Sequence, residues 1–374
     1  MSYHPELSPS RRSWLIATPL IVVLLLALGW SGFWYYAASQ ADARINEWQA
    51  QQVGAGRAFS CGKQAVGGYP FRIEARCTDV SVELKDTQPP LALKLKEILV
   101  VSQIWDPKLF IAEFTGPLTA ADPGQAPHTT AIWTLAQASV RGTPNLPDRA
   151  SIVVDDLKLT DSPGTPLFDA KHAEFHARVQ FGSWPHNPAI DLAANLKTAS
   201  APGLSPYARD ALDADLTAVL HGVKDFAVKP LPVLLRDWQA GGGRFEIQSA
   251  RIAQGETLAT ATGTLGLTQA GRLDGALQLD VAGLEKLLPA IAQQKGVALS
   301  LDRAAPALNA IDRAVPGLGT RLAPQAQNMA VGLLGLLGKP VEIEGKRGVS
   351  VPVRFKDGSA SFGPIPLGQV PTVF

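Results

Sequence analysis

The chain has 374 residues, of which 46% are hydrophobic and 18% charged, and its formal net charge is +1. A near-neutral balance gives no indication of nucleic acid as a partner and excludes an acidic solvating tail. The length allows a sizeable core and suggests about two domains, for which we expect a division into residues 41–204 and 205–374.

The first predicted element is a transmembrane anchor at 13–40, behind a short tail at 1–12. No charged residue lies between Arg12 and Asp42, whereas a helix that spans a bilayer needs about 20 apolar residues. Aromatic side chains crowd the far end of the run, as they do at membrane interfaces. They are Trp30, Phe33, Trp34, Tyr35 and Tyr36.

The charges beside this run predict its orientation. Arg11 and Arg12 precede it, and the positive-inside rule therefore keeps the tail inside and sends the body across the membrane. A cleaved signal peptide is the alternative, because 37–39 are small enough for a cleavage site. The run is longer than a usual signal core, and its aromatic end suits an interface, which favours an uncleaved anchor.

A short polar helix at 41–52 and a strand at 71–77 follow the anchor. Gly54 and Gly56 are expected to end the helix. In the strand, apolar and charged residues alternate with a period of two, which indicates that one face is buried. Glycine and proline at 67–70 predict a turn just before it.

Cys61 and Cys77 are the two cysteines of the chain and lie equally far from Tyr69. A hairpin that turns there would place them opposite each other, within reach of a disulfide. In a chain sent across a membrane, this pattern predicts one structural disulfide, with two buried free thiols as the alternative. The spacing excludes a redox CxxC motif and a metal site.

A series of short strands then occupies most of the chain. Because no helices separate the earlier ones, they indicate an antiparallel sheet. A strand at 216–221 and a short helix at 231–239, stopped by Gly241, interrupt the series. The predicted strands are 91–101, 109–114, 131–140, 151–159, 167–179, 190–196, then a meander of 244–252, 257–267 and 272–281, and finally 341–355.

Helices are predicted at 284–294, 304–314 and 324–337. The apolar run 329–337 is too short for a second span, so it is either a core helix or a surface that meets lipid. The predicted fold class is mainly β (α+β), with a curved antiparallel sheet and a few helices behind one N-terminal transmembrane helix.

No catalytic, cofactor or metal site emerges from the sequence. His172 and His176 are four residues apart on a predicted strand, which separates them by about 13 Å. The metalloprotease, hydrolase, phosphate-loop and dinucleotide motifs are absent from the sequence, and we expect a protein that is not an enzyme. Four tryptophans could line a ligand groove or pack in a core: Trp105, Trp133, Trp184 and Trp238.

The segment GGYPFRIEARC at 67–77, with the anchor and Cys61, resembles a family of bacterial membrane-anchored proteins known only as a domain of unknown function. WDP at 105–107 and GPIPLG at 363–368 belong to the same resemblance, which covers nearly the whole chain. The meander at 244–281 is also similar to the C-terminal strands of AsmA-like proteins. Those are inner-membrane-anchored envelope proteins with β-rich periplasmic bodies, associated with lipid homeostasis and phospholipid transport.

The resemblances imply a single-pass protein of the bacterial inner membrane, with a cytoplasmic N-terminus and a periplasmic body. One curved sheet has more apolar face than a few short helices cover, and large exposed apolar patches bind something. We therefore expect the body to bind lipids or amphiphiles, with a non-enzymatic scaffold for envelope proteins as the alternative. The candidate lipid-facing residues are Leu265, Leu267, Leu273, Leu277 and Leu279.

Overall fold

The computed structural model describes residues 12–374, except 86, 88, 143–146, 163, 185, 187, 204–207, 228, 284–337 and 363–364. The three helices predicted at 284–294, 304–314 and 324–337 therefore lie outside the described residues, as does the apolar run 329–337.

The N-terminal helix α1 (Arg12–Gly54) is continuous over 43 residues. It joins the predicted anchor and the predicted polar helix at 41–52 into one element, because the alanines and polar residues between them do not break a helix. It ends at Gly54, as predicted. The segment Ala17–Gly54 is long and apolar enough to cross a membrane.

The remainder of the described chain is dominated by one 18-stranded antiparallel sheet, which confirms the predicted mainly β fold class. The first half contains β1 (Arg57–Ser60), β2 (Lys63–Gly67), β3 (Arg72–Leu84), β4 (Leu91–Gln103), β5 (Asp106–Ala121), β6 (Thr129–Ile132), β7 (Leu135–Arg141), β8 (Arg149–Asp161) and β9 (Pro166–Val179). The second half contains β10 (Ala189–Ala199), β11 (Leu212–His221), β12 (Arg244–Gln254), β13 (Thr257–Leu267), β14 (Leu273–Ala282), β15 (Lys339–Ile343), β16 (Lys346–Lys356), β17 (Ser359–Phe362) and β18 (Ile365–Gln369).

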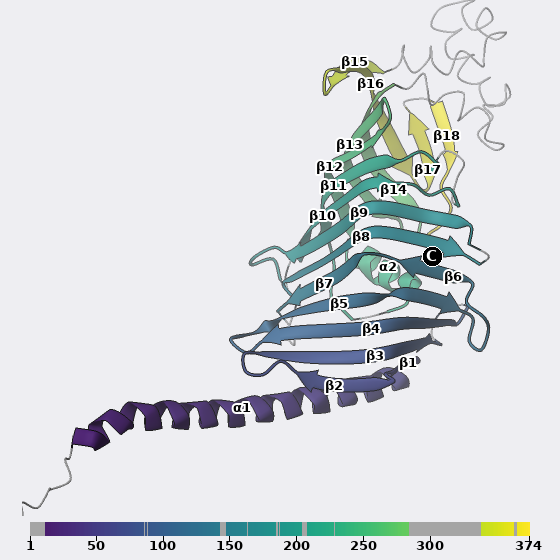
Figure 1. Ribbon diagram of the computed structural model, residues 1–374. Helices are drawn as coiled ribbons and strands as arrows, with labels where there is room; N and C mark the ends of the chain where they lie inside the picture. The colour runs from purple at the N-terminus through teal and green to yellow at the C-terminus, as the bar shows by residue number, and fades with distance from the viewer. Residues whose placement is uncertain are drawn as a thin grey trace, which may run out of the picture.

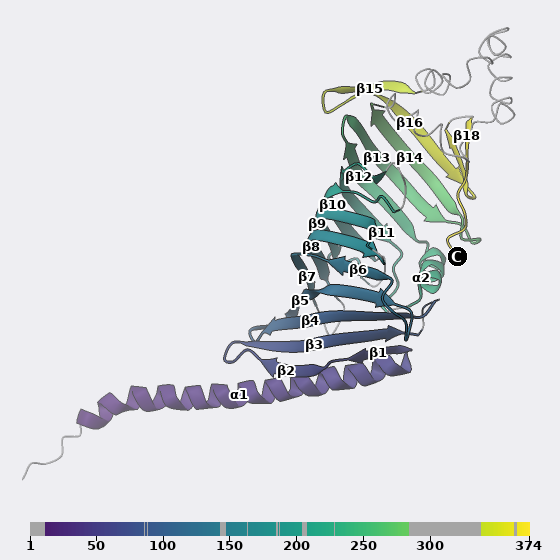
Figure 2. The same ribbon diagram turned by 45° about the vertical axis from the view of Figure 1, so that its right-hand side comes forward.

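The strands follow one another through the sheet almost in chain order. β1 and β2 both pair with β3, and β6 and β7 both lie between β5 and β8. Beyond β14, the sheet continues with β16, which also pairs with β15 and β17. The strands are stacked upward from α1, and the sheet curves as it rises (Figures 1 and 2). One sheet therefore runs across position 204, and the proposed division into two domains stays a prediction.

Two predicted strands are in fact pairs of strands. The segment 131–140 is split into β6 and β7 at Trp133, whose indole N–H donates to the carbonyl of Phe114 at 2.8 Å. The segment 341–355 is the β15–β16 hairpin, which turns at Glu344 and Gly345, both with positive φ. The predicted helix is present as α2 (Leu231–Ala240), which ends at Gly241.

The strand register separates two faces of the sheet. One row of paired residues, the inner row, is apolar from β3 to β16, and the row next to it, the outer row, is mostly polar. The inner row is Ala75, Val100, Ala112, Ala138, Ile152, Phe175, Ala194, Leu216, Ala250, Ala261, Leu279 and Val351. The outer row is Arg76, Leu99, Glu113, Gln137, Val153, Glu174, Asn195, Asp215, Arg251, Thr260, Asp280 and Ser350.

In the described part of the chain, little covers the face that carries the inner row, which we call the inner face. The described residues contain two helices. Helix α1 contacts β1, β2 and β3 at one end of the sheet, and α2 lies on the inner side of the curved sheet (Figure 2). The largest side chain in the described residues with less than 2% exposure is Leu258. Among the described residues the sheet is thus largely a single layer, and every side chain of the inner row except Val351 is half-buried or exposed rather than enclosed.

Candidate functional site

The centre of the inner face is open. Ile152 on β8 is paired with Phe175 on β9, and these side chains are 44% and 39% exposed. Ile252 on β12 is 49% exposed. Together with Leu216 they line a hollow of about 470 Å³ that crosses β8 to β12. An ordinary sheet core would bury these side chains against a second layer.

A second hollow of about 440 Å³ lies where β3 to β8 meet. It shares Ile152 and Val154 with the first, so the two are contiguous. Apart from Lys94, the side chains that line it are apolar, and they include Trp133 and Phe114. Trp133 thus lines a hollow, which is the first of the two roles expected for it, while its indole N–H is bonded to the backbone.

A third hollow of about 540 Å³ lies between the inner face and α2. Ile190, Leu220 and Phe245 contribute from the sheet, and Leu234 and Trp238 from the helix. The indole N–H of Trp238 donates to the carbonyl of His221 at 2.7 Å, which holds the helix against β11. The volumes of all three hollows fall in the range of about 300–1,000 Å³ typical of small-molecule sites.

The other two tryptophans lie elsewhere. Trp184 makes a tilted ring contact with Phe226, with ring centroids 5.5 Å apart. Trp105, in the turn between β4 and β5, is 64% exposed and contacts Phe71.

The predicted lipid-facing leucines share the inner face of β13 and β14. Leu265 is paired with Gly275, Leu277 with Gly263, and Leu267 with Leu273. All five, including Leu279, are half-buried. The register therefore brings them together, and their contact with lipid stays a prediction. Sequence reasoning missed Ile152, Phe175 and Ile252. Only Phe175 lies between two polar residues, Glu174 and His176, and the strand pairing that brings the three side chains to one hollow has no local sequence signal.

The outer face has a different chemistry. Arg178 and Asp191 form an ion pair at 2.7 Å, and Gln137 donates to Glu113 at 3.0 Å. His172 and His176 lie on strand β9, as predicted, and both approach Glu174, at 3.5 and 3.4 Å. In the described part of the chain, no group of three or more histidine, cysteine, aspartate or glutamate side chains is arranged to hold a metal ion.

The pKa of the His172 imidazole is raised above its ordinary value of 6.5, chiefly by the hydrogen bond to Asp155 at 2.6 Å. Glu174 adds to this effect, and burial opposes it. Lys197 on β10 is paired with His172 from the other side. Protonated His172 is therefore stabilised in the folded protein. This contribution is complete well below the unfolded pKa and is lost as the pH rises through the raised folded pKa.

We predict that the thermal stability lost in His172→Gln is largest at mildly acidic pH and shrinks as the pH rises above neutrality. Melting temperatures of the protein and the variant, compared across that range, measure it. His186→Gln, at an exposed turn position, is the matched control and should give no such trend. A loss in His172→Gln that is the same at every pH would contradict the prediction.

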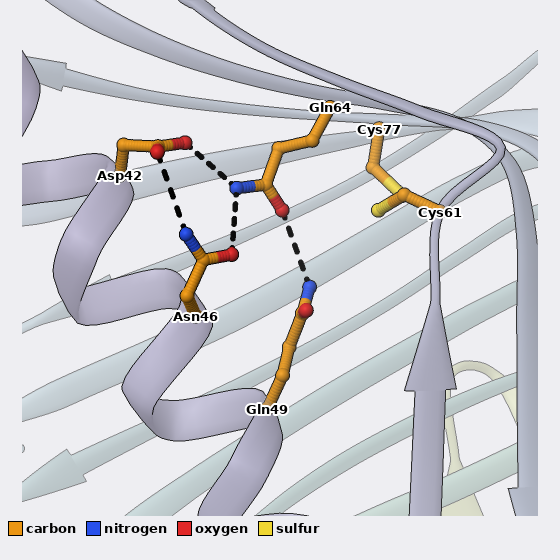
Figure 3. Close-up of a disulfide and its surroundings, with 6 residues drawn as sticks. All are labelled: Asp42, Asn46, Gln49, Cys61, Gln64 and Cys77. Atoms are coloured by element: carbon orange, nitrogen blue, oxygen red, sulfur yellow. Dashed lines mark hydrogen bonds between the residues drawn. A yellow bond between two sulfur atoms is a disulfide. The ribbon is translucent and has the colours of Figure 1, made fainter.

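The predicted disulfide between Cys61 and Cys77 is present, with Cα atoms 5.4 Å apart (Figure 3). The predicted hairpin also turns at 68–71, between β2 and β3. The pairing is not the direct one expected, because Gln64, and not Cys61, lies opposite Cys77. Cys61 instead occupies the break between β1 and β2, where the backbone N–H of Gly62 donates to the carbonyl of Thr78 at 2.9 Å. The disulfide therefore links the segment between β1 and β2 covalently to β3.

Gln64, close to the disulfide, connects the sheet to α1 (Figure 3). Its amide nitrogen donates to Asp42 at 2.8 Å and to Asn46 at 3.2 Å, and its amide oxygen accepts from Gln49 at 3.3 Å. Three successive turns of the helix are thus bonded to one side chain of β2. Trp48 adds a ring contact with Phe59 at 4.8 Å. The orientation of α1 relative to the sheet is consequently fixed by specific contacts.

A comparison with protein families confirms the resemblance to a bacterial family of unknown function, whereas the similarity to AsmA-like proteins stays a prediction. No sequence in a search of curated proteins matches the chain. Residues 34–371 match a family described as an uncharacterised protein conserved in bacteria, DUF2125. This match begins inside the apolar part of α1 and extends through the last strand of the sheet. The chain therefore belongs to the DUF2125 family of bacterial proteins.

Proposed function

We propose that this protein is a non-enzymatic lipid-binding protein of the bacterial envelope that accommodates acyl chains along the inner face of its sheet. In this proposal α1 anchors the protein in the inner membrane and the body lies in the periplasm. The single observation that carries the proposal is the inner row, an unbroken apolar path whose central side chains are exposed.

The length and chemistry of the inner row support acyl chains as ligands. At about 4.8 Å between neighbouring strands, the path from β3 to β16 is roughly 50 Å long. Burial of each methylene group contributes about 0.8 kcal/mol, so an extended chain gains affinity along its length without needing polar recognition. Polar groups at fixed points, which a small polar ligand would require, are scarce in the hollow that contains Trp133 and Phe114.

The location is supported by two features of the same end of the molecule. The apolar part of α1 is long enough to span a bilayer. The disulfide between Cys61 and Cys77 suits an oxidising compartment such as the periplasm.

Site-specific photo-crosslinking in living cells tests the proposed ligand. A photoreactive amino acid at Phe175 on the inner face is expected to form adducts of lipid mass. The same amino acid at Glu174, the preceding residue of β9, points to the outer face and is the matched control. Mass spectrometry of the purified, full-length protein measures the adducts formed at both positions.

A charged substitution on the inner face gives an independent test of lipid binding. Phe175→Glu places a carboxylate in the apolar path, and desolvating it is costly. We expect at least a tenfold loss of lipid adducts at a reporter placed at Ile252, with an unchanged melting temperature as the check on folding. Adducts of protein mass at Phe175, without lipid, would favour the scaffold function. Equal labelling at Phe175 and Glu174 would refute a specific inner-face site.

A further inference from the structure

The tip of the β2–β3 hairpin packs against the apolar part of α1. The indole N–H of Trp30 donates to the carbonyl of Pro70, and that of Trp34 to the carbonyl of Arg72, both at 2.9 Å. The hydroxyls of Ser31 and Tyr69 are 2.8 Å apart. The tip of the β2–β3 hairpin is therefore held beside residues 30–34 of the helix.

These contacts lie within the uncharged part of α1. The first charged residue after it is Asp42, which at 1.5 Å per residue is roughly 12–18 Å further along the helix than Trp34 and Trp30. If α1 spans a bilayer, the hairpin tip is consequently at the depth where the helix is still among lipids or at their boundary. The polar contacts of Gln64 with the helix begin only at Asp42.

A second tip extends this surface. Trp105, in the β4–β5 turn, makes a tilted ring contact with Phe71, with centroids 6.2 Å apart, and Phe71 makes a similar contact with Trp30 at 6.4 Å. The backbone N–H of Ile104 donates to the carbonyl of Phe71 at 3.2 Å. Trp105 and Phe71 are nevertheless 64% and 57% exposed. The cluster thus joins two hairpins to the helix and still presents its rings outward.

The sequence of both tips fits a bilayer and not water. Neither 64–71 nor 98–105 contains a charged residue. Charge reappears where the strands leave the tips, with Arg72 bonded to Glu74 at 2.5 Å and Arg141 to Asp106 at 2.6 Å. Aromatic rings backed by arginines are the arrangement found at the boundary between acyl chains and headgroups.

We infer that the tips of the β2–β3 and β4–β5 hairpins insert into the membrane leaflet nearest the sheet, with Tyr69, Phe71 and Trp105 at the level of the acyl–headgroup boundary. The occupant of this surface is the phospholipid bilayer itself, because the surface is continuous with the apolar face of α1. This inference rests on the proposal that α1 spans the membrane. Phe71 belongs to the same alternating series as Ile73 and Ala75 on β3, so the inner face begins at the inserted tip.

Fluorescent labels at single engineered cysteines test the insertion in full-length protein reconstituted into phosphatidylethanolamine–phosphatidylglycerol vesicles. The first test position is Trp105→Cys, which removes the Trp105 ring. Phe71→Cys is a second test position in which that ring is still present. Leu24→Cys, in the apolar part of α1, reports on the premise. Ile132→Cys on β6 is the matched control, since Ile132 is 49% exposed. Quenching of each label's fluorescence by a nitroxide on the lipid acyl chains measures the contact of that label with the bilayer.

We expect strong quenching at positions 24, 71 and 105 and little at 132. Quenching at 24 without quenching at 71 and 105 would overturn the insertion and leave the anchor intact. Absence of quenching at 24 would overturn both the anchor and the insertion. Equal quenching at 132 and 105 would show general adsorption of the sheet and would also contradict insertion by the tips.

Discussion

Replacing Cys61 and Cys77 together by serine is expected to lower the free energy of unfolding by about 3 kcal/mol. The bond closes a loop with a sequence separation of 16 residues, and the chain-entropy model assigns about that stabilisation to a loop of this size. Local protection against opening should decrease most at the junction with α1, because the bond links the segment between β1 and β2, next to Gln64, to β3. Denaturant unfolding followed by circular dichroism measures the total effect.

Hydrogen exchange locates the same effect, with amides of β2 losing more protection than those of β13 in the double variant. The strand pattern itself should survive. A double variant as stable as the parent would show that the bond contributes no net stability. In cells, we expect no reactive thiol in the parent protein. Two reactive thiols would contradict both the disulfide and the proposed oxidising location of the body.

Gly275→Ala is expected to destabilise the sheet by about 3 kcal/mol. Gly275 has φ of +141°, and a Cβ atom there would lie 2.2 Å from the carbonyl oxygen of Thr264 on the neighbouring strand. Backbone carbonyls of a paired strand cannot move aside as a flexible side chain would. Conformations of this kind are close to glycine-only and cost about 1–3 kcal/mol for other residues, and the clash adds to that cost.

The cost of Gly275→Ala is measured as a shift of the unfolding midpoint. Gly67→Ala is the matched control, because Gly67 also lies in a strand but a Cβ atom there would meet nothing within 4 Å. We expect a change below about 1 kcal/mol for it. Equal effects of the two substitutions would show that the close approach of β13 and β14 at Gly275 is not a constraint on the fold.

The sequence predicted most elements of this fold because the alternation of apolar and polar residues is a local signal. It placed the meander of β12 to β14 and the face shared by Leu277 and Leu279, and the glycines at 241–243 placed the end of α2. The cysteine pair was also predictable, although equal distance from Tyr69 suggested a direct cross-strand pair that the register does not contain.

The inner row could not be predicted, because it depends on the register of many strands at once. Leu95 and Ile98 line the same hollow, although a strict period of two would place them on opposite faces. The irregularity between Leu95 and Glu97 reverses the alternation there. One such shift, undetected in the sequence, exchanges the inner and outer faces for the rest of a strand. The contact of Tyr69 with Ser31 is likewise a tertiary feature without a local signal.

The nearly sequential order of the strands has a consequence for how the protein is made and how it diversifies. From β3 to β14, each strand pairs with strands that are its near neighbours in the chain, so the contact order of this part is low for a β protein and each new hairpin finds its template already in place. Energetically, the sheet resembles a one-dimensional array in which each unit interacts with its neighbours. Such an array can gain or lose a whole hairpin without changing the pairing of the other strands. The number of strands in the sheet is therefore a property that evolution can adjust.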